Sequence, residues 1–483
     1  MKVLAVASEI FPLVKTGGLA DVTGALPRAL SREKVEVRTL VPGYPAVLSR
    51  LDKAETVHEL EALFGGSARL LEAQAGELTL FVLDAPHLYA RDGNPYLDGH
   101  GLDWPDNAFR FAALARIGAQ IGHGLLPSFA PDLLHAHDWQ AGLSPAYLRA
   151  THRRGPPSVM TVHNLAFQGL FPATLLGPLE LPGEMMHLDG IEFHGKIGFL
   201  KAGLNFADAI TTVSPSYAEE IRTEAEGMGL DGLLRARASV LTGICNGIDT
   251  GIWDPLNDPH LAARYDANDL ASKAVDKTEL QAKLGLSPTA TGPLIGVVSR
   301  LTEQKGMDLV AATVDDLAAR GVQLALIGTG DRALEAELTA AAARHPGMVA
   351  VRIGYDEPLA HQIQGGSDIL AVPSRFEPCG LTQLSALRYG TLPLVSRVGG
   401  LADTVIDANE AALAAGVATG LQFSPPTREA LLRAIDRALA LWPDKDIWRR
   451  LQRNAMRSDV GWDRSARLYA MLFEEVVERA GAR

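Results

Sequence analysis

Short apolar runs alternate with segments of helical periodicity along the whole chain, and this alternation restricts the fold more than any other feature. It is typical of a parallel sheet whose strands are joined by helices. In the first half we expect strands at 2–7, 36–41, 78–84, 131–136, 157–162 and 209–213, and helices at 105–121 and 196–206. In the second half we expect strands at 293–298, 322–327, 348–353, 368–372 and 392–396, and helices at 307–319, 332–344, 381–389 and 428–441. The sequence therefore predicts an α/β protein with two doubly wound, Rossmann-like domains.

Chain length and one short segment suggest where these domains meet. A chain of 483 residues can form two or three domains, each with its own core. Apolar sequence gives way to Asn, Gly and Asp at 243–250, which is typical of a joint. We expect an N-terminal domain over 1–245, a second domain over 246–457, and an amphipathic C-terminal helix within 458–483.

Net charge restricts the class of partner, and cysteine content restricts the compartment. The chain has 45 Lys and Arg against 57 Asp and Glu, a formal net charge of −12. This acidic excess argues against nucleic acid and is compatible with a neutral polymer such as a glucan. Cys245 and Cys379 fall in different halves of the chain, so we expect a reducing compartment and no disulfide framework. Without a long apolar run or a leader-like start, we expect a cytoplasmic protein that does not bind membranes.

The first candidate site is Lys15-Thr16-Gly17-Gly18, which follows the apolar run 3–6 and precedes a helix-like segment. Glycines let backbone amides approach an anion, a helix N-terminus adds partial positive charge, and Lys15 adds a full charge. A strand-to-helix turn needs glycine in any case, so this string alone leaves a purely structural role open. We interpret it as a phosphate loop because two further loops point to the same chemistry.

Both of these loops also follow apolar strands. Residues 299–306 carry Arg300 and Lys305, two cations whose spacing suits a diphosphate. Residues 374–382 carry Glu377, followed by Gly380 at the entrance of a helix. Amide donors, cations and one carboxylate are therefore predicted at the carboxyl ends of strands, where doubly wound sheets bind ligands.

Taken together, these strings resemble the bacterial glycogen synthases and plant starch synthases that use ADP-glucose, and the resemblance covers essentially the whole chain. It is carried by SEIFPLVKTGGLADV at 8–22, HAHDWQAG at 135–142, TVHNLAFQG at 161–169, SPSYAEEI at 214–221, NGID at 246–249, SRLTEQKG at 299–306, SRFEPCGLTQL at 374–384 and GGLADTV at 399–405.

The resemblance implies a fold and an activity. The fold is GT-B, with two Rossmann-like domains facing across a cleft that closes on substrate, and with the last helix packing back on the first domain. The activity is that of a glycogen synthase, an ADP-glucose:α-1,4-glucan 4-α-glucosyltransferase of glycogen biosynthesis. Glucose passes with retention of configuration to the 4-hydroxyl at a non-reducing end, and ADP leaves. The partners implied are ADP-glucose and glycogen or another α-1,4-glucan.

Residue roles follow from the same resemblance. Arg300 and Lys305 stabilise the leaving diphosphate, which itself takes the acceptor's proton, and Glu377 positions the glucose hydroxyls and stabilises positive charge at C1. His163 is the fourth catalytic residue implied, with its carbonyl or ring near the sugar, and Asp138 binds substrate in the donor-sugar and acceptor region. The remaining substrate-binding residues are Lys15, Gly18, Asp21, Asn164, Asn246, Tyr355, Cys379, Gly380, Leu381 and Thr382. Among these, Asn246 suits a sugar hydroxyl, the amides of 379–381 suit hydroxyls or phosphate, and Tyr355 suits stacking on adenine, although a loop tyrosine is otherwise usually a packing residue.

Neither a metal nor a cofactor is expected. His135, His137, Asp138 and His163 have no standard zinc spacing, and a hydrogen-bonded place near the core is an equal alternative for His135. Asp444 and Asp446 lie between helices, so we interpret them as helix capping or surface charge.

Ser385 departs from the family pattern, in which the eighth position after the glutamate is usually Tyr or a second Glu. Two alternatives to the glycogen synthase assignment stay open. One is another GT-B enzyme, either a transferase of UDP-sugars or a glucan phosphorylase, although we find no pyridoxal phosphate site. The other is a catalytically silent glucan-binding scaffold. Oligomeric state is not predicted.

Overall fold

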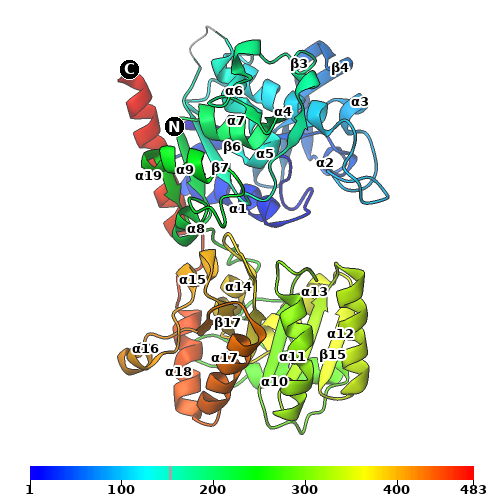
Figure 1. Cartoon of the computed structure of the whole chain (residues 1–483), viewed down its shortest axis with the longest axis vertical. Coiled ribbons are helices and arrows are strands. Elements are labelled where there is room, and N and C mark those ends of the chain that lie inside the picture. The colour runs from blue at the N-terminus through cyan, green and yellow to red at the C-terminus, as the bar shows by residue number, and fades with distance from the viewer. Residues whose placement is uncertain (152–154, 483) are drawn as a thin grey trace. The chain divides into compact units, whose positions relative to one another are not determined.

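The structure is a computed structural model, and it describes residues 1–151 and 155–482. By its internal contacts the chain forms two compact units (Figure 1). Unit 1 comprises Met1–Asn246 and the segment from Trp462 onward, and unit 2 comprises Gly247–Gly461. Within the described residues no helix combines the length and the apolar character needed to cross a membrane.

Unit 1 is built on one mixed sheet with the strand order β12-β11-β7-β6-β1-β2-β5-β4-β3. The strands are β1 (Lys2–Val6), β2 (Glu36–Pro42), β3 (Lys53–Leu63), β4 (Gly66–Ala75), β5 (Leu78–Asp84), β6 (Leu133–His137), β7 (Ser158–Val162), β11 (Ala209–Thr212) and β12 (Leu241–Gly243). The pairs from β12 to β5 are parallel, whereas β5-β4 and β4-β3 are antiparallel. The six parallel strands predicted for this half are present, and three strands extend the sheet beyond the prediction, namely the parallel strand β12 and the antiparallel strands β3 and β4.

Helices connect and cover these strands. They are α1 (Gly18–Arg32), α2 (Pro45–Leu48), α3 (Pro86–Tyr89), α4 (Asn107–Gly122), α5 (Asp138–Ala141), α6 (Leu143–Arg149), α7 (Phe199–Phe206), α8 (Pro215–Glu220), α9 (Asp231–Ala236) and α19 (Asp463–Gly481). Short 3-10 helices occupy 173–175, 183–185 and 238–240. In Figure 1 the red helix α19 lies against this unit, where Phe473 and Tyr469 share one apolar cluster with Leu26 and Leu30 of α1.

One predicted helix is wrong at its start. The segment expected as a single helix over 196–206 begins with strand β10 (Lys196–Gly198), and only α7 is helical. This strand pairs antiparallel with β8 (Leu170–Pro172) and β9 (Glu192–Phe193) in a small separate sheet. Gly195 precedes it at φ 76°, a left-handed conformation that favours glycine and reverses the chain between β9 and β10.

Unit 2 holds a fully parallel sheet with the order β15-β14-β13-β16-β17-β18. Its elements are α10 (Lys273–Leu284), β13 (Leu294–Val298), α11 (Met307–Ala319), β14 (Gln323–Gly328), α12 (Arg332–Arg344), β15 (Val349–Ile353), α13 (Glu357–Gly366), β16 (Ile369–Val372), α14 (Thr382–Arg388), β17 (Leu392–Ser396), α15 (Gly399–Thr404), α16 (Glu410–Ala415), β18 (Leu421–Phe423), α17 (Arg428–Leu441) and α18 (Lys445–Met456). The strands and helices predicted for this half are all present within one or two residues, and the α/β class is confirmed.

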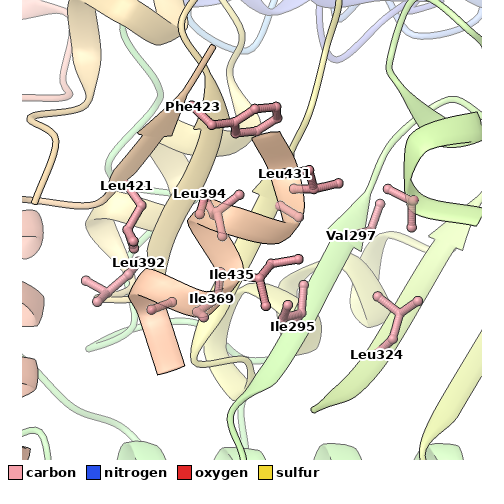
Figure 2. Packing of buried hydrophobic residues seen from close by; sticks show 14 of the residues in the cluster. Ile295, Val297, Leu324, Ile369, Leu392, Leu394, Leu421, Phe423, Leu431 and Ile435 are labelled. Carbon is pink, nitrogen blue, oxygen red and sulfur yellow. The ribbon is translucent and has the colours of Figure 1, made fainter. Parts of the chain in front are cut away.

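Apolar side chains from several strands meet one helix in the core of unit 2. Figure 2 shows Leu431 and Ile435 of α17 packed against side chains of the sheet, among them Ile369 and Leu394. Burying one such side chain contributes roughly 1.5–3 kcal/mol. The strands are therefore held rigidly, and the loops at their carboxyl ends start from fixed positions.

Candidate functional site

Both sheets reverse their strand order at a point where the predicted motifs lie. In unit 1 the order changes direction between β1 and β6; the loop after β1 contains Lys15, and Asp138 follows β6 as the first residue of α5. In unit 2 it changes between β13 and β16, and the loops that follow contain Arg300, Lys305 and Glu377. In open α/β sheets ligands bind outside the carboxyl ends of strands at such a switch point. The topology thus marks these loops as binding sites without reference to any relative.

A buried ion pair joins the loop after β13 to the loop after β16. Lys305 Nζ lies 2.6 Å from Glu377 Oε2, and Ser374 Oγ donates to the same oxygen at 3.0 Å. The Glu377 side chain is only 8% exposed and that of Lys305 19% exposed. Burial of a carboxylate is costly unless a cation and hydrogen bonds compensate it. The carboxylate is therefore fixed in one orientation, with Oε2 occupied.

Arg300 lies on the same loop as Lys305, but it differs from Lys305 in exposure and in its partners. It is exposed, and its guanidinium donates only a weak hydrogen bond, from Nη2 to Gln304 Oε1 at 3.5 Å. Among the described residues no carboxylate forms a salt bridge with it. Gln304 also links the two loops, because its main-chain oxygen accepts from the Arg375 amide at 2.8 Å. Arg300 is therefore a cation whose charge is available to a ligand.

The segment 379–381 reaches α14 through a constrained turn. Gly380 has φ 73°, and Gln383 Nε2 donates to the main-chain oxygens of Cys379 and Gly380, each at 2.9 Å. These bonds turn the carbonyls toward Gln383. The helix itself begins at Thr382, so the amides of residues 379–381 stand just before its first turn, the position predicted for anion or hydroxyl binding.

Three other residues singled out from the sequence differ in exposure and in their hydrogen bonds. Tyr355 follows edge strand β15 and is 76% exposed, and its hydroxyl donates to Glu357 at 3.4 Å. Asn246 is buried, and its Oδ1 accepts no hydrogen bond from the described residues. Ser385 lies buried on α14, and its hydroxyl donates to Leu381 O at 3.4 Å within its own helix, not to Glu377.

In unit 1 the loop after β1 is longer than the sequence analysis assumed. Residues 7–17 separate β1 from α1, and an Ile10–Val14 bridge closes a small turn in between. Lys15 Nζ pairs with Asp21 Oδ1 at 2.7 Å, which places both predicted residues together at the start of α1. Gly18 is the first residue of that helix.

The sequence analysis missed Glu9, which organises this loop. Its side chain is buried, and its carboxylate accepts from the amide and hydroxyl of Thr16 and from the hydroxyl of Tyr96. Its carbonyl accepts from the Thr23 hydroxyl at 2.7 Å. A glutamate inside the otherwise apolar stretch after a buried strand was the available signal, because a buried carboxylate needs partners.

Asp138 stands directly after β6 in a strained conformation, with φ 56°. Its Oδ1 accepts from the His163 amide at 2.7 Å, and the Asn164 amide also bonds to the carboxylate. Burial raises the pKa of Asp138 to about 7, with the nearby Glu9 charge as a lesser cause. A positive φ at a non-glycine residue costs free energy, and residues with such strained backbones cluster at functional sites. The predicted residues Asp138, His163 and Asn164 are thus in one cluster.

Three histidines lie near Asp138: His135 and His137 on β6, and His163 directly after β7. His137 Nδ1 and His163 Nε2 are 3.0 Å apart, and His135 Nε2 lies 2.6 Å from Thr161 Oγ1. Burial lowers the pKa of His135 and of His163 to about 3, and that of His137 well below its ordinary value. All three rings are neutral at pH 7. His135 is buried and hydrogen-bonded to Thr161, which agrees with the alternative that it is a residue near the core.

No group of three or more His, Cys, Asp or Glu side chains in the described residues is arranged to hold a metal ion. The Asp444 carboxylate accepts from the amides of Asp446 and Ile447, so its predicted role as a helix cap is confirmed.

Comparisons with known proteins agree with this geometry. Residues 2–236 match the starch synthase catalytic domain family, and residues 277–456 match the glycosyl transferases group 1 family. The chain is 60% identical to a glycogen synthase of Acidiphilium cryptum (strain JF-5) over 99% of this chain and 100% of that protein. It is 59% identical to one of Rhodopseudomonas palustris (strain ATCC BAA-98 / CGA009), with 99% of each chain covered.

Two solved structures are similar over 99% of both chains. The catalytic domain of starch synthase IV from Arabidopsis thaliana, bound to ADP and acarbose, has a TM-score of 0.90 at 30% identity. Sucrose-phosphate synthase from Thermosynechococcus elongatus has a TM-score of 0.60 at 17% identity, a likeness of fold alone. The expected GT-B fold is confirmed.

Proposed function

Since the chain belongs to the family of glycogen synthases and starch synthases, we propose that it transfers glucose from ADP-glucose to an α-1,4-glucan. The acceptor atom is the 4-hydroxyl oxygen at a non-reducing end, and ADP is released. The ADP bound to the starch synthase relative supports this donor. The observation that carries the proposal is the set of charges at the β13–β16 switch point, one accessible cation beside a buried Lys-Glu pair.

Donor activation is assigned to unit 2. Breaking the bond between C1 of glucose and the diphosphate leaves negative charge on the departing oxygen, so cations and amide donors accelerate the step. Arg300 meets this need most directly because no described carboxylate neutralises it. Lys305 and the amides of 379–381 complete the set, and Tyr355 is assigned to the adenine.

Glu377 is assigned to the glucose itself. Lys305 and Ser374 occupy Oε2, so Oε1 is the atom left to accept from sugar hydroxyls and to stabilise positive charge at C1. We propose retention of configuration without a covalent glycosyl intermediate. The acceptor oxygen bonds to C1 as the C1–phosphate bond breaks, and the acceptor's proton passes to the departing phosphate oxygen. Retaining hydrolases instead use a second carboxylate about 5 Å away, and the side chains bonded to Glu377 here are Lys305 and Ser374.

Acceptor binding is assigned to unit 1. Asp138 offers a buried carboxylate oxygen for glucan hydroxyls, and the hydrogen bonds from His163 and Asn164 orient it. A neutral polyol is bound by hydrogen bonds more than by charge. The three neutral histidines near Asp138 are compatible with such a ligand. Lys15 and Gly18 remain assigned to phosphate and Asn246 to a sugar hydroxyl.

The test is nucleotide release from ADP-glucose and from UDP-glucose, with and without glycogen, in the presence of EDTA. We expect ADP release that depends on glycogen and survives EDTA, with slower release of UDP. Faster turnover of UDP-glucose would replace the donor assignment. Glycogen binding without release from either donor would favour the silent scaffold.

A further inference from the structure

Unit 1 contains a pocket that the proposed reaction does not use. Its volume is about 110 Å³, enough for several water molecules or a small ligand. The pocket lies between the segment that starts α2 and the loop after α3. It is lined by Val14, Tyr44, Pro45, Ala46, Arg91, Asp92, Gly93, Asn94, Pro95 and Arg110. None of these residues is assigned to the donor or the acceptor above.

Arg110 forms part of the pocket wall and is fully buried. Its guanidinium donates to the main-chain oxygens of Leu88 at 2.9 Å and Pro95 at 2.7 Å, and to Asn107 Oδ1 at 2.7 Å. These acceptors are all neutral. Nη2 has no hydrogen-bond partner among the described residues. Asp106 and three aromatic rings near the guanidinium offset part of its charge, but no carboxylate forms an ion pair with Arg110 in the described chain, and a buried guanidinium is costly without one.

Tyr44 provides a second unused polar group in the same wall. It is 5% exposed, and its hydroxyl has no hydrogen-bond partner among the described residues. The Arg110 guanidinium carbon lies 6.0 Å from the centre of the Tyr44 ring. A buried hydroxyl and a buried N–H group each cost free energy when they bond to nothing. Two such groups in one pocket wall indicate a ligand that accepts hydrogen bonds from both.

The charges around the pocket favour an anion at its inner end. Arg91 and Asp106 neutralise each other through a bidentate pair, at 2.8 and 2.7 Å. Asp92 lines the pocket but is exposed, where water and salt screen its charge. Burial raises the pKa of Tyr44, and the nearby Glu9 charge is a lesser cause; Glu9 is outside the lining, and it already accepts from Thr16 and Tyr96. Arg110 is thus the one lining charge that is both buried and not matched by an ion pair in the described chain.

We propose that this pocket binds a small oxyanion, either a phosphate group or a carboxylate, held by Arg110 Nη2 and the Tyr44 hydroxyl. Arginine and tyrosine donors with no competing acceptor are suited to such an oxygen. The pocket also touches the loop that carries Lys15, because Val14 lines it and Val14 bridges to Ile10. An anion bound here therefore contacts the segment that leads to Lys15.

The test is calorimetric titration with inorganic phosphate and, separately, with acetate, in protein saturated with ADP so that phosphate sites of the donor are occupied. The variants are Tyr44→Phe, which removes only the unused hydroxyl, and Ala46→Glu, which adds a carboxylate at the exposed side of the pocket. Ala46→Gln is the matched control, with the same length and no charge.

We expect one of the two anions to bind the wild-type protein, and the other to bind more weakly. Tyr44→Phe should weaken binding roughly ten- to a hundredfold, the range for a hydrogen bond to a charged group. Ala46→Glu should weaken binding only severalfold, because its charge is exposed and screened as that of Asp92 is, and Ala46→Gln should bind as the wild type does. In anion-free buffer Tyr44→Phe should melt no lower than the wild type, because the lost hydroxyl bonds to nothing.

Absence of binding by both anions at 50 mM would overturn the proposal and leave the pocket to water. Equal binding in the wild type, Tyr44→Phe and Ala46→Glu would overturn it as well, because the anion would then lie elsewhere. Neither result depends on transferase activity, so failure of the pocket and failure of the proposed function are distinguishable.

Discussion

Substituting either of the two cations of the loop after β13 should lower catalysis to a similar extent, but only the substitution of Lys305 should lower stability strongly. Lys305 pairs with the buried Glu377 carboxylate at 2.6 Å, whereas Arg300 is exposed and bonds only to Gln304 at 3.5 Å. The variants that separate these situations are Arg300→Gln and Lys305→Gln. The double variant Lys305→Gln/Glu377→Gln is the control, because it replaces the ion pair by two neutral amides.

The catalytic magnitude follows from Coulomb's law. A cation about 4 Å from a new unit charge is worth about 4 kcal/mol at an effective dielectric near 20. That corresponds to about a thousandfold in rate. Either single variant should therefore lower kcat by about three powers of ten. Arg300→Lys should recover part of the loss because it keeps the charge but not the planar fork.

The stability magnitude follows from burial. Removing one partner of a buried pair costs about 3–5 kcal/mol, and the 19% exposure of Lys305 places this case near the lower end. A loss of about 3 kcal/mol lowers the melting temperature of a domain this size by roughly 6–12 °C. Arg300→Gln should melt within about 2 °C of the wild type, because exposed charges contribute little. The double variant should melt near the wild type while staying inactive.

The assays are initial rates of ADP release at saturating ADP-glucose and glycogen, and calorimetric melting of the same preparations. Two results would refute the reasoning. One is an Arg300→Gln variant that keeps more than a tenth of the wild-type kcat. The other is a Lys305→Gln variant that melts with the wild type, which would mean that the pair does not stabilise unit 2.

Three further predictions concern other parts of the two units. Burial raises the pKa of Asp138 from its ordinary value near 4 to about 7, so the folded protein holds a proton that the unfolded chain has released, and its stability falls as pH rises from about 4 to 7. In Asp138→Asn, urea titrations should show no such fall in the free energy of unfolding. We expect kcat/KM for glycogen to rise near pH 7 in the wild type as Asp138 loses its proton, and this rise should be absent from the variant. Glu9→Gln weakens the hydrogen bonds from Thr16 and should speed amide exchange in residues 10–17 by at least tenfold. Gly400→Ala places a Cβ 2.3 Å from Cys379 O, so the KM for ADP-glucose should rise at least fivefold, which steady-state kinetics measures.

Most of the parallel strands could be predicted because each is a short apolar run, and strands covered on both faces need such runs. The parallel edge strands β12 and β18 were missed because each has only three residues. The antiparallel strands β3 and β4 could not be predicted. Residues 53–63 carry charged and exposed side chains on both faces of an edge strand, so no apolar alternation marks them. The strand at 196–198 was hidden because its apolar residues continue without interruption into α7.

For the site, the sequence located the loops but not the partners within them. Lys305 and Glu377 were predicted for phosphate and sugar respectively, and their pairing depends on β13 and β16 being neighbours across the switch point. The pKa of Asp138 could not be predicted either, because it depends on burial and on amides of residues 163–164 that only the fold brings near. Glu9 was overlooked because one of its partners, Tyr96, is distant in the chain and is brought near only by the fold.

The most direct test of the central claim is the transfer of labelled glucose from ADP-glucose to a maltooligosaccharide, with the new linkage determined by NMR. The account predicts one added α-1,4-linked glucose at the non-reducing end for each ADP released. A β linkage would contradict retention, and labelled free glucose in place of a longer chain would contradict transferase activity altogether.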